Sequence, residues 1–208
     1  MPDLTDRRPL ASRQTAWARR VTLWLVARRI TPNGISILSM LAAACAGAAF
    51  ALGGHHPAGL LIAALFCQLR LLCNLFDGLV AVEGGKAAPD GPFWNEAPDR
   101  LSDLFILAGF GAAAGRLDLG LLAAALAIFT AYLRELGRAN GLGNDFSGPF
   151  AKPQRMALVT GAAVLAALAG WVGLAWPVLY WGLIVLVLGT AITILRRALR
   201  QIHAHHRG

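Results

Sequence analysis

Two stretches of the chain, each about forty residues long, contain no formally charged side chain. The first lies between Arg29 and Arg70 and is interrupted only by the turn-forming residues 53–57 (GGHHP). The second covers residues 156–195 and breaks near residues 170–177. Because a helix that crosses a bilayer needs roughly 20 apolar residues, each stretch predicts two membrane spans joined by a short turn.

Two shorter apolar runs, residues 104–115 and 119–133, lie between these pairs. Each is long enough to span a membrane only if it includes a more polar neighbouring segment, residues 97–103 for the first run and residues 134–138 for the second. The pattern therefore predicts six spans, with polar side chains entering the membrane on the third and fourth.

The composition supports this interpretation. Of the 208 residues, 57% are apolar and only 14% are charged, against roughly 25% charged in soluble proteins. The mean hydropathy is +0.57. We therefore expect an all-α integral membrane bundle of six transmembrane helices and exclude a large soluble domain.

The N-terminal segment differs from the rest. Residues 12–30 place Trp17, Val21 and Trp24 among five arginines, which favours an amphipathic helix on the cytoplasmic leaflet. The alternative is a partly ordered basic leader, which would still be attracted to anionic headgroups. The residues TPN at 31–33 predict a helix stop and restart.

The expected organisation has three parts: a cytoplasmic basic leader with the interfacial helix over residues 1–33, a six-span membrane domain over residues 34–200, and a cytoplasmic tail over residues 201–208.

The charge distribution predicts the orientation. Of the 19 lysines and arginines, 18 fall on one predicted face of the membrane and only Arg116 falls on the opposite face. The positive-inside rule places the face that carries the 18 basic residues, together with both termini, in the cytoplasm. The chain opens with polar residues rather than a signal peptide, so we expect the first span to direct insertion into the cell's inner (cytoplasmic) membrane. The net charge of +8, in so apolar a chain, favours anionic lipid or an anionic membrane substrate over nucleic acid.

Carboxylates concentrate around the second and third spans. Six of the 11 acidic residues fall within 27 positions: Asp77, Glu83, Asp90, Glu96, Asp99 and Asp103. A charge inside a span costs about 2.5 to 3.5 kcal/mol on insertion scales, so such residues are candidates for a functional site. Loop solvation explains Glu83 and Asp90. Helix capping and ion pairs with Arg70, Arg100 or Lys86 remain the alternative for the others.

Oxygen-bearing side chains repeat at helical spacing on both spans. The second span carries Asn74 and Asp77, and the third carries Asn95, Asp99 and Asp103. Residues three or four apart share a helix face, so two helices can present oxygen ligands toward one another. Mg²⁺ typically takes one or two carboxylates together with substrate phosphates. Gly78 and Gly91 would let a phosphate approach the backbone closely.

These residues resemble the motif of the CDP-alcohol phosphatidyltransferase family, which reads DxxDGxxAR and, about eight residues later, GxxxDxxxD. This chain has NLFDGLVAV at residues 74–82 and GPFWNEAPD at residues 91–99, with matching spacing at every step. Asn74 and Asn95 replace two acids, and Val82 replaces the arginine. The six spans, the basic leader and the TPN entry also resemble this family, so the likeness covers nearly the whole chain.

The resemblance implies an enzyme of phospholipid synthesis. It would transfer a substituted phosphate from a CDP-alcohol, with CDP-diacylglycerol the expected donor, to an alcohol acceptor and release CMP. The site would face the cytoplasm and hold two divalent cations, Mg²⁺ or Mn²⁺. By position, Asn74, Asp77, Asn95 and Asp99 would bind metal, and Asp99 would also act as the base on the acceptor hydroxyl. Family members often form homodimers.

Further residues are assigned around this centre. Asp103, one helical turn beyond Asp99, and Glu96 can restore the charge that the two asparagines remove, with Asp103 the better placed. The nucleotide would lie against Gly78, Ala81 and Gly91, with Lys86 in place of the missing arginine. The acceptor or lipid phosphate would be bound by Arg134, Arg138, Lys152 and Arg155. Positive-inside anchoring is the alternative explanation for this last group.

Two other functions compete. The substitutions at Asn74, Val82 and Asn95 also fit a catalytically degenerate relative that binds nucleotide or lipid, or stabilises a partner. A small transporter that uses intramembrane carboxylates is a third possibility, but no broken-helix repeat supports it.

Overall fold

The computed structural model describes residues 15–85, 90–174 and 177–205, and within them the protein consists of seven helices without strands. The helices are α1 (Ala16–Ala27), α2 (Pro32–Gly53), α3 (Pro57–Glu83), α4 (Gly91–Ala113), α5 (Leu117–Ala139), α6 (Lys152–Trp171) and α7 (Val178–His205). The predicted all-α class is confirmed.

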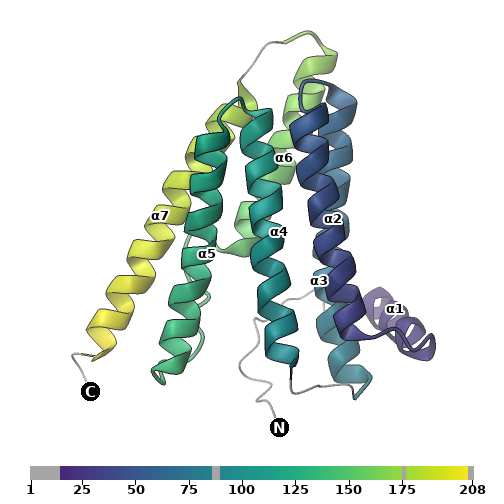
Figure 1. Ribbon diagram of the computed structural model, residues 1–208, viewed down its shortest axis with the longest axis vertical. Helices are drawn as coiled ribbons and strands as arrows, with labels where there is room; N and C mark the ends of the chain where they lie inside the picture. Colours follow the sequence, from purple (N-terminus) through teal and green to yellow (C-terminus); the bar gives the residue numbers. More distant parts are fainter. Residues whose placement is uncertain (1–14, 86–89, 175–176, 206–208) are drawn as a thin grey trace.

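The six long helices form one upright bundle (Figure 1). Their most extensive contacts form a closed cycle, in the order α2, α3, α6, α7, α5, α4 and back to α2, and α4 also contacts α7. The apolar core inside this cycle includes the fully buried side chains of Phe50, Ile106, Phe110 and Leu183. The aromatic rings of Phe50 and Phe110 meet edge to face, with their centroids 5.4 Å apart.

Five of the described helices are long and apolar enough to cross a membrane: α2, α3, α5, α6 and α7. Their outward faces carry apolar side chains such as Leu65, Leu168 and Leu188, which are 67%, 50% and 59% exposed. A bilayer is the solvent that such faces require. Together these features indicate a multi-pass membrane protein. The remaining long helix, α4, contains Asp99, Arg100 and Asp103.

The helix ends lie close to the predicted breaks. Residues 54–56 separate α2 from α3, and α6 ends at Trp171, before α7 begins at Val178. Proline occupies one of the first two positions of α2, α3, α4 and α6, where its missing N–H costs no hydrogen bond. This preference explains why α4 begins at Gly91, several residues before the segment that we expected to extend the third span.

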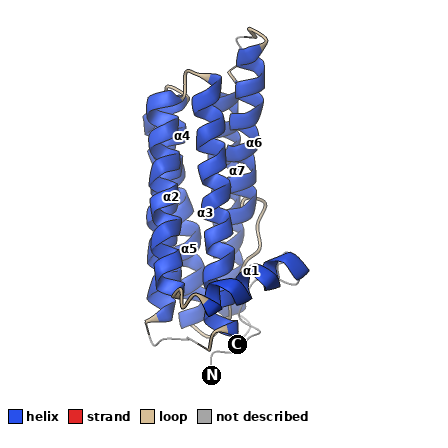
Figure 2. Ribbon diagram, turned by 90° about the vertical axis from the view of Figure 1, so that its right-hand side faces the viewer, coloured by secondary structure: helices blue, strands red, loops and turns tan. Residues whose placement is uncertain are grey.

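The short helix α1 lies beside the bundle at the end where α7 finishes (Figure 2). It covers Ala16–Ala27, within the predicted residues 12–30, and it packs on α3 through an edge-to-face contact of Trp17 with Phe76 at 5.8 Å. The chain then turns at Arg29, which has a φ of 58°. Thr31 Oγ1 accepts a hydrogen bond from the Gly34 amide over 3.2 Å, so the predicted stop and restart is confirmed.

Helices α2 and α4 approach each other closely because both have glycine at the crossing. A Cβ atom on Gly47 would overlap the backbone carbonyl of Phe105, and one on Gly109 would overlap the backbone of Gly47. Small residues at such a crossing let two helix backbones pack directly against each other. This crossing brings α4 into the bundle and so fixes the depth of its polar residues.

The Gly47→Ala substitution is expected to destabilise the bundle, because the added methyl group meets backbone that cannot move aside. Overpacking of this kind costs about 1–3 kcal/mol, which corresponds to a fall of roughly 5 °C in the thermal unfolding midpoint of the detergent-solubilised protein. Gly161→Ala is the matched control, because a Cβ there meets nothing within 4 Å. An equal effect of the two substitutions would contradict this account of the crossing.

Candidate functional site

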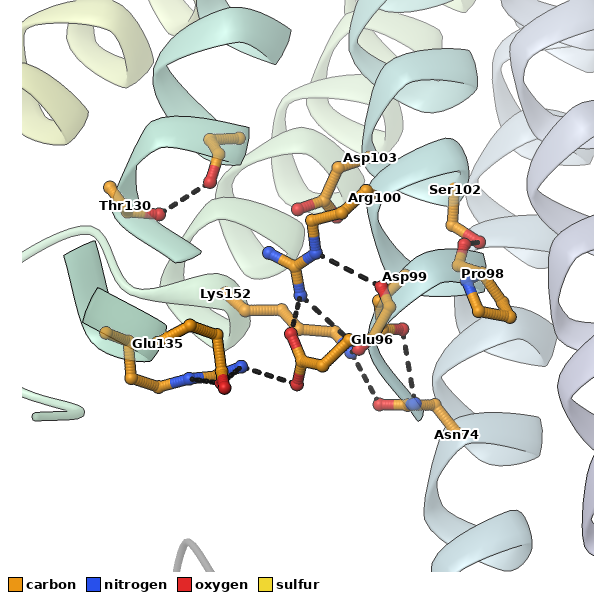
Figure 3. Close-up of polar contacts among 12 residues, drawn as sticks. Asn74, Glu96, Pro98, Asp99, Arg100, Ser102, Asp103, Thr130, Glu135 and Lys152 are labelled. Carbon is orange, nitrogen blue, oxygen red and sulfur yellow. Dashed lines mark hydrogen bonds and ion pairs between the residues drawn. The ribbon is translucent and has the colours of Figure 1, made fainter. Parts of the chain in front are cut away.

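The two halves of the spaced sequence motif are in direct contact. Asn74 of α3 donates a hydrogen bond from Nδ2 to Asp99 Oδ1 of α4 over 3.2 Å, across 25 positions of sequence (Figure 3). Asp99 is buried and Asn74 is partly buried. The expected convergence of oxygen-bearing side chains from these two helices is therefore present for this pair.

Asp77 lies one turn further along α3 and is 5% exposed. Its Oδ2 accepts a hydrogen bond from Ser36 Oγ of α2 over 3.0 Å, and its Oδ1 accepts one from the Gly78 amide over 2.6 Å. The charges of Asp99 and Lys152 are close enough to act on it. Both hydrogen-bond donors are neutral, and no described residue forms an ion pair with this carboxylate.

Asp99, by contrast, is surrounded by cationic side chains. Its Oδ1 accepts a hydrogen bond from Arg70 Nη2 over 2.9 Å in addition to the one from Asn74. Its Oδ2 forms a direct ion pair with Lys152 Nζ, while Arg100 lies 3.8 Å away. A carboxylate has about four acceptor sites, so Oδ1 is saturated and Oδ2 retains one free position.

Asp103 lies deeper in the bundle and is fully buried. Its Oδ2 pairs with Arg155 of α6 at 3.1 Å, and its Oδ1 lies 3.5 Å from Arg70. Arg70, itself fully buried, thus bridges Asp99 and Asp103. Within the described residues, Asp103 therefore serves as the counter-ion of two buried arginines.

A second polar group lies nearer the surface. Glu96 pairs with Arg134 of α5 and, at 3.3 Å, with Arg100 one turn further along α4. Glu135 pairs with Arg134 at 2.9 Å and with Arg138 at 2.8 Å. Each of the four cationic residues predicted to bind phosphate therefore has a carboxylate partner in this structure, including Lys152 and Arg155 in the buried group.

The loop before α6 positions Lys152, the first residue of that helix. The Phe150 amide donates a hydrogen bond to Thr193 Oγ1 of α7 over 3.0 Å, and Arg155 Nη1 donates one to the Phe150 carbonyl over 3.0 Å. Arg197 of α7 donates to the Ser147 carbonyl over 3.0 Å. In Figure 1, α6 begins partway along the bundle while α3 and α4 extend below it. The ammonium of Lys152 thereby reaches α3 and α4.

Several predicted residues are only partly described. Lys86 and the side chain of Asn95 lie outside the described residues. Ala81 is partly buried on α3. Gly91 begins α4, and a Cβ there would meet nothing within 4 Å, so its backbone is accessible to a ligand.

Two site residues were not among the sequence predictions. Arg70 was considered only as a pairing partner, although it precedes Asn74 by four positions and Asp77 by seven and therefore shares their helix face. Its place in an apolar span was the signal that it belongs to the site. Ser36 gave no such signal, because a serine near the start of a span is common and its contact with Asp77 depends on the packing of α2 on α3.

The donor set admits a divalent cation beside Asp77. A buried carboxylate without a cationic partner is costly, and a bound cation would remove that cost. Oxygen donors of this kind suit Mg²⁺ or Mn²⁺. The described residues contain no cluster of three or more His, Cys, Asp or Glu side chains that could hold a metal, so further ligands would have to come from amide oxygens, water or substrate.

Comparison with known proteins identifies the fold. No protein-family model matches the sequence, and no curated protein matches it significantly. Phosphatidylinositol phosphate synthase of Mycobacterium tuberculosis, in complex with manganese and citrate, superposes with a TM-score of 0.74 at 22% identity, covering 89% of this chain and 88% of that chain.

Two further structures of that synthase agree. The one with CDP-DAG bound gives a TM-score of 0.74 at 20% identity, with 90% of this chain and 94% of that chain covered. The apo form gives 0.68 at 20% identity, with 88% and 94% covered. The synthase belongs to the CDP-alcohol phosphatidyltransferase family, so the resemblance noted in the sequence is matched by the fold.

Proposed function

We propose that this chain is a CDP-alcohol phosphatidyltransferase that transfers a substituted phosphate from a CDP-alcohol, with CDP-diacylglycerol the expected donor, to an alcohol and releases CMP. The observation that carries the proposal is the direct contact of Asn74 with Asp99, with Asp77 one turn away. The shared fold of a synthase whose structures contain CDP-DAG and manganese supports it.

The family motif places the metal-binding positions at Asn74, Asp77, Asn95 and Asp99. In this chain Asp77 would hold the divalent cation, which when bound would neutralise charge on the diphosphate. The backbone at Gly78 and Gly91 would lie against the nucleotide, because neither residue has a side chain to obstruct it. Asp103 acts through Arg70, which it shares with Asp99.

Asp99 is the base in this proposal. Its free acceptor position on Oδ2 can take the proton of the acceptor hydroxyl, while Arg70 and Asn74 hold Oδ1 in a fixed orientation. A phosphate on the acceptor would be received by Arg134 and Arg138, whose carboxylate partners Glu96 and Glu135 are partly exposed. Each would exchange a carboxylate partner for a charge-assisted bond to phosphate.

In the membrane, α4 would be the sixth span and α1 would lie on the cytoplasmic leaflet with Leu23 and Trp24, which are more than half exposed, toward lipid. The arginines of α1 and of the end of α7 lie at one end of the bundle, which the positive-inside rule assigns to the cytoplasm. The bilayer would tolerate the charged residues of α4, because Asp99 and Asp103 face the bundle interior and form ion pairs there.

The proposal is tested by incubating the purified protein in detergent or vesicles with CDP-diacylglycerol, Mn²⁺ and a panel of alcohols, including phosphorylated ones. We expect CMP release that depends on both the acceptor and the cation, with an equal amount of new phospholipid. A complete absence of CMP release across donors, acceptors and both cations would contradict the enzymatic proposal.

One observation favours the second candidate, a nucleotide- or lipid-binding protein without turnover. Both oxygens of Asp99 already contact cationic groups of the chain itself, so the charge of this carboxylate is compensated without a substrate. This candidate predicts saturable binding of CDP-diacylglycerol without CMP release. It also predicts that Asp77→Asn and Asp99→Asn leave cellular function intact.

A further inference from the structure

We propose that the Lys152 side chain is a resident cation of this site that takes the place of one divalent ion, so that the chain binds a single divalent cation, at Asp77. The inference rests on the proposed function for the role of the metal.

The geometry is that of a bridging cation. Lys152 Nζ donates to Asn74 Oδ1 over 2.7 Å and pairs directly with Asp99 Oδ2 (Figure 3). It therefore joins one oxygen from α3 to one from α4, across 78 and 53 positions of sequence. A metal ion bound between these two helices would use the same two oxygen atoms.

The charges agree with this assignment. Asn74 has an amide where the family motif has an acid, so the oxygen pair carries one negative charge instead of two. A divalent ion loses much of its attraction to such a pair, whereas an ammonium of single charge matches it and donates up to three hydrogen bonds. Arg70 also occupies Asp99 Oδ1, which further disfavours a second divalent ion there.

The contrast with Asp77 locates the remaining metal. This carboxylate is buried and has only neutral donors, Ser36 Oγ and the Gly78 amide, among the described residues. Of the two motif acids that remain, Asp99 is thus neutralised by the chain itself, whereas Asp77 forms no ion pair with any described residue.

The loop before α6 makes Lys152 a fixed feature of the site. Phe150, two residues before Lys152, donates its amide hydrogen to Thr193. The Phe150 ring fills the space beside Gly189, where a Cβ atom would overlap it. The Lys152 side chain is only 22% exposed. This anchoring holds the ammonium in place without the substrate.

The test is the Mn²⁺ stoichiometry of the purified protein, measured by electron paramagnetic resonance with no donor or acceptor present. We expect the double variant Asn74→Asp/Lys152→Met to bind one Mn²⁺ per chain more than the wild type. Asn74→Asp alone is expected to leave the stoichiometry unchanged, because Lys152 still fills the position. Arg116→Met, which removes a positive charge at the opposite end, is the control and is also expected to leave the stoichiometry unchanged.

Three results would overturn the proposal: two Mn²⁺ per chain in the wild type, an additional ion in Asn74→Asp alone, or no additional ion in the double variant. The readout is independent of turnover, so it can fail while CMP release succeeds, or succeed while CMP release fails.

A second measurement does not depend on the double variant folding. Lysine occurs only at positions 86 and 152, so reductive methylation followed by mass spectrometry reports Lys152 directly, with Lys86 as the reference in the same sample. Asp99→Asn is expected to increase the rate at Lys152 at least five-fold relative to Lys86, because the ion pair is lost. An unchanged ratio would show that Lys152 is not held at this site and would overturn the proposal.

Discussion

Replacing Asp99 with asparagine is expected to lower the rate of CMP release about a thousand-fold. The substitution preserves shape but removes the proton acceptor, and general-base catalysis typically contributes 10²–10⁴-fold. It also removes the negative charge that α4 contributes at the point of contact with α3. The measurement is CMP release at saturating donor, acceptor and Mn²⁺, with the protein checked for helix content and monodispersity.

The matched control for this substitution is Asp118→Asn. Asp118 is an exposed aspartate at the opposite end of the bundle, where it pairs with Arg116 at 2.7 Å, and an exposed ion pair contributes little to stability. Its removal is expected to change CMP release less than two-fold. An Asp99→Asn protein that retained more than a tenth of the wild-type rate would show that Asp99 is not the base.

Replacing Asp103 with asparagine is expected to produce the largest loss of stability. Asp103 is fully buried between Arg155 and Arg70, and its removal leaves two buried guanidinium groups with only Asp99 nearby. Breaking a buried ion pair from one side typically costs about 3–5 kcal/mol. In a chain of this size, that cost corresponds to a fall of roughly 10 °C in the unfolding midpoint.

The double variant Asp103→Asn/Arg155→Met separates this counter-ion role from a direct role in metal binding. Removing one of the two unpaired cations is expected to restore part of the unfolding midpoint. If Asp103 were instead a metal ligand, Asp103→Asn would leave the midpoint of the metal-free protein within about 2 °C of the wild type, and the second substitution would restore nothing.

The sequence was sufficient to predict the fold class and the contact between the two halves of the motif. Apolar runs of membrane-spanning length allow few structures other than helices, and the breaks at residues 53–57 and 170–177 were marked by turn-forming and aromatic residues. Asn74 and Asp99 each lie at helical spacing from other polar residues, so each belongs to a polar helix face. Such a face is stable inside a membrane only if its polar groups have hydrogen-bond or ion-pair partners.

The partners themselves could not be predicted. Lys152 reaches Asn74 across 78 positions, and this contact depends on where the loop before α6 is anchored to α7 by Phe150 and Thr193. The carboxylate that forms an ion pair with Arg70 is determined by the rotation of α3 relative to α4. The close approach of α2 to α4 at Gly47 sets that arrangement, and small residues alone do not specify which helices they bring together.

In the proposed function, side chains of α3 and α4 bind the diphosphate of a CDP-alcohol through a divalent cation. The most direct measurement is a structure of the protein with CDP-diacylglycerol and Mn²⁺, with the ion located by anomalous scattering. We expect a manganese ion within roughly 2.0–2.5 Å of an Asp77 oxygen and the diphosphate between Gly78 and Gly91. A diphosphate bound elsewhere, with Asp77 still held only by Ser36 Oγ and the Gly78 amide, would contradict the proposed function.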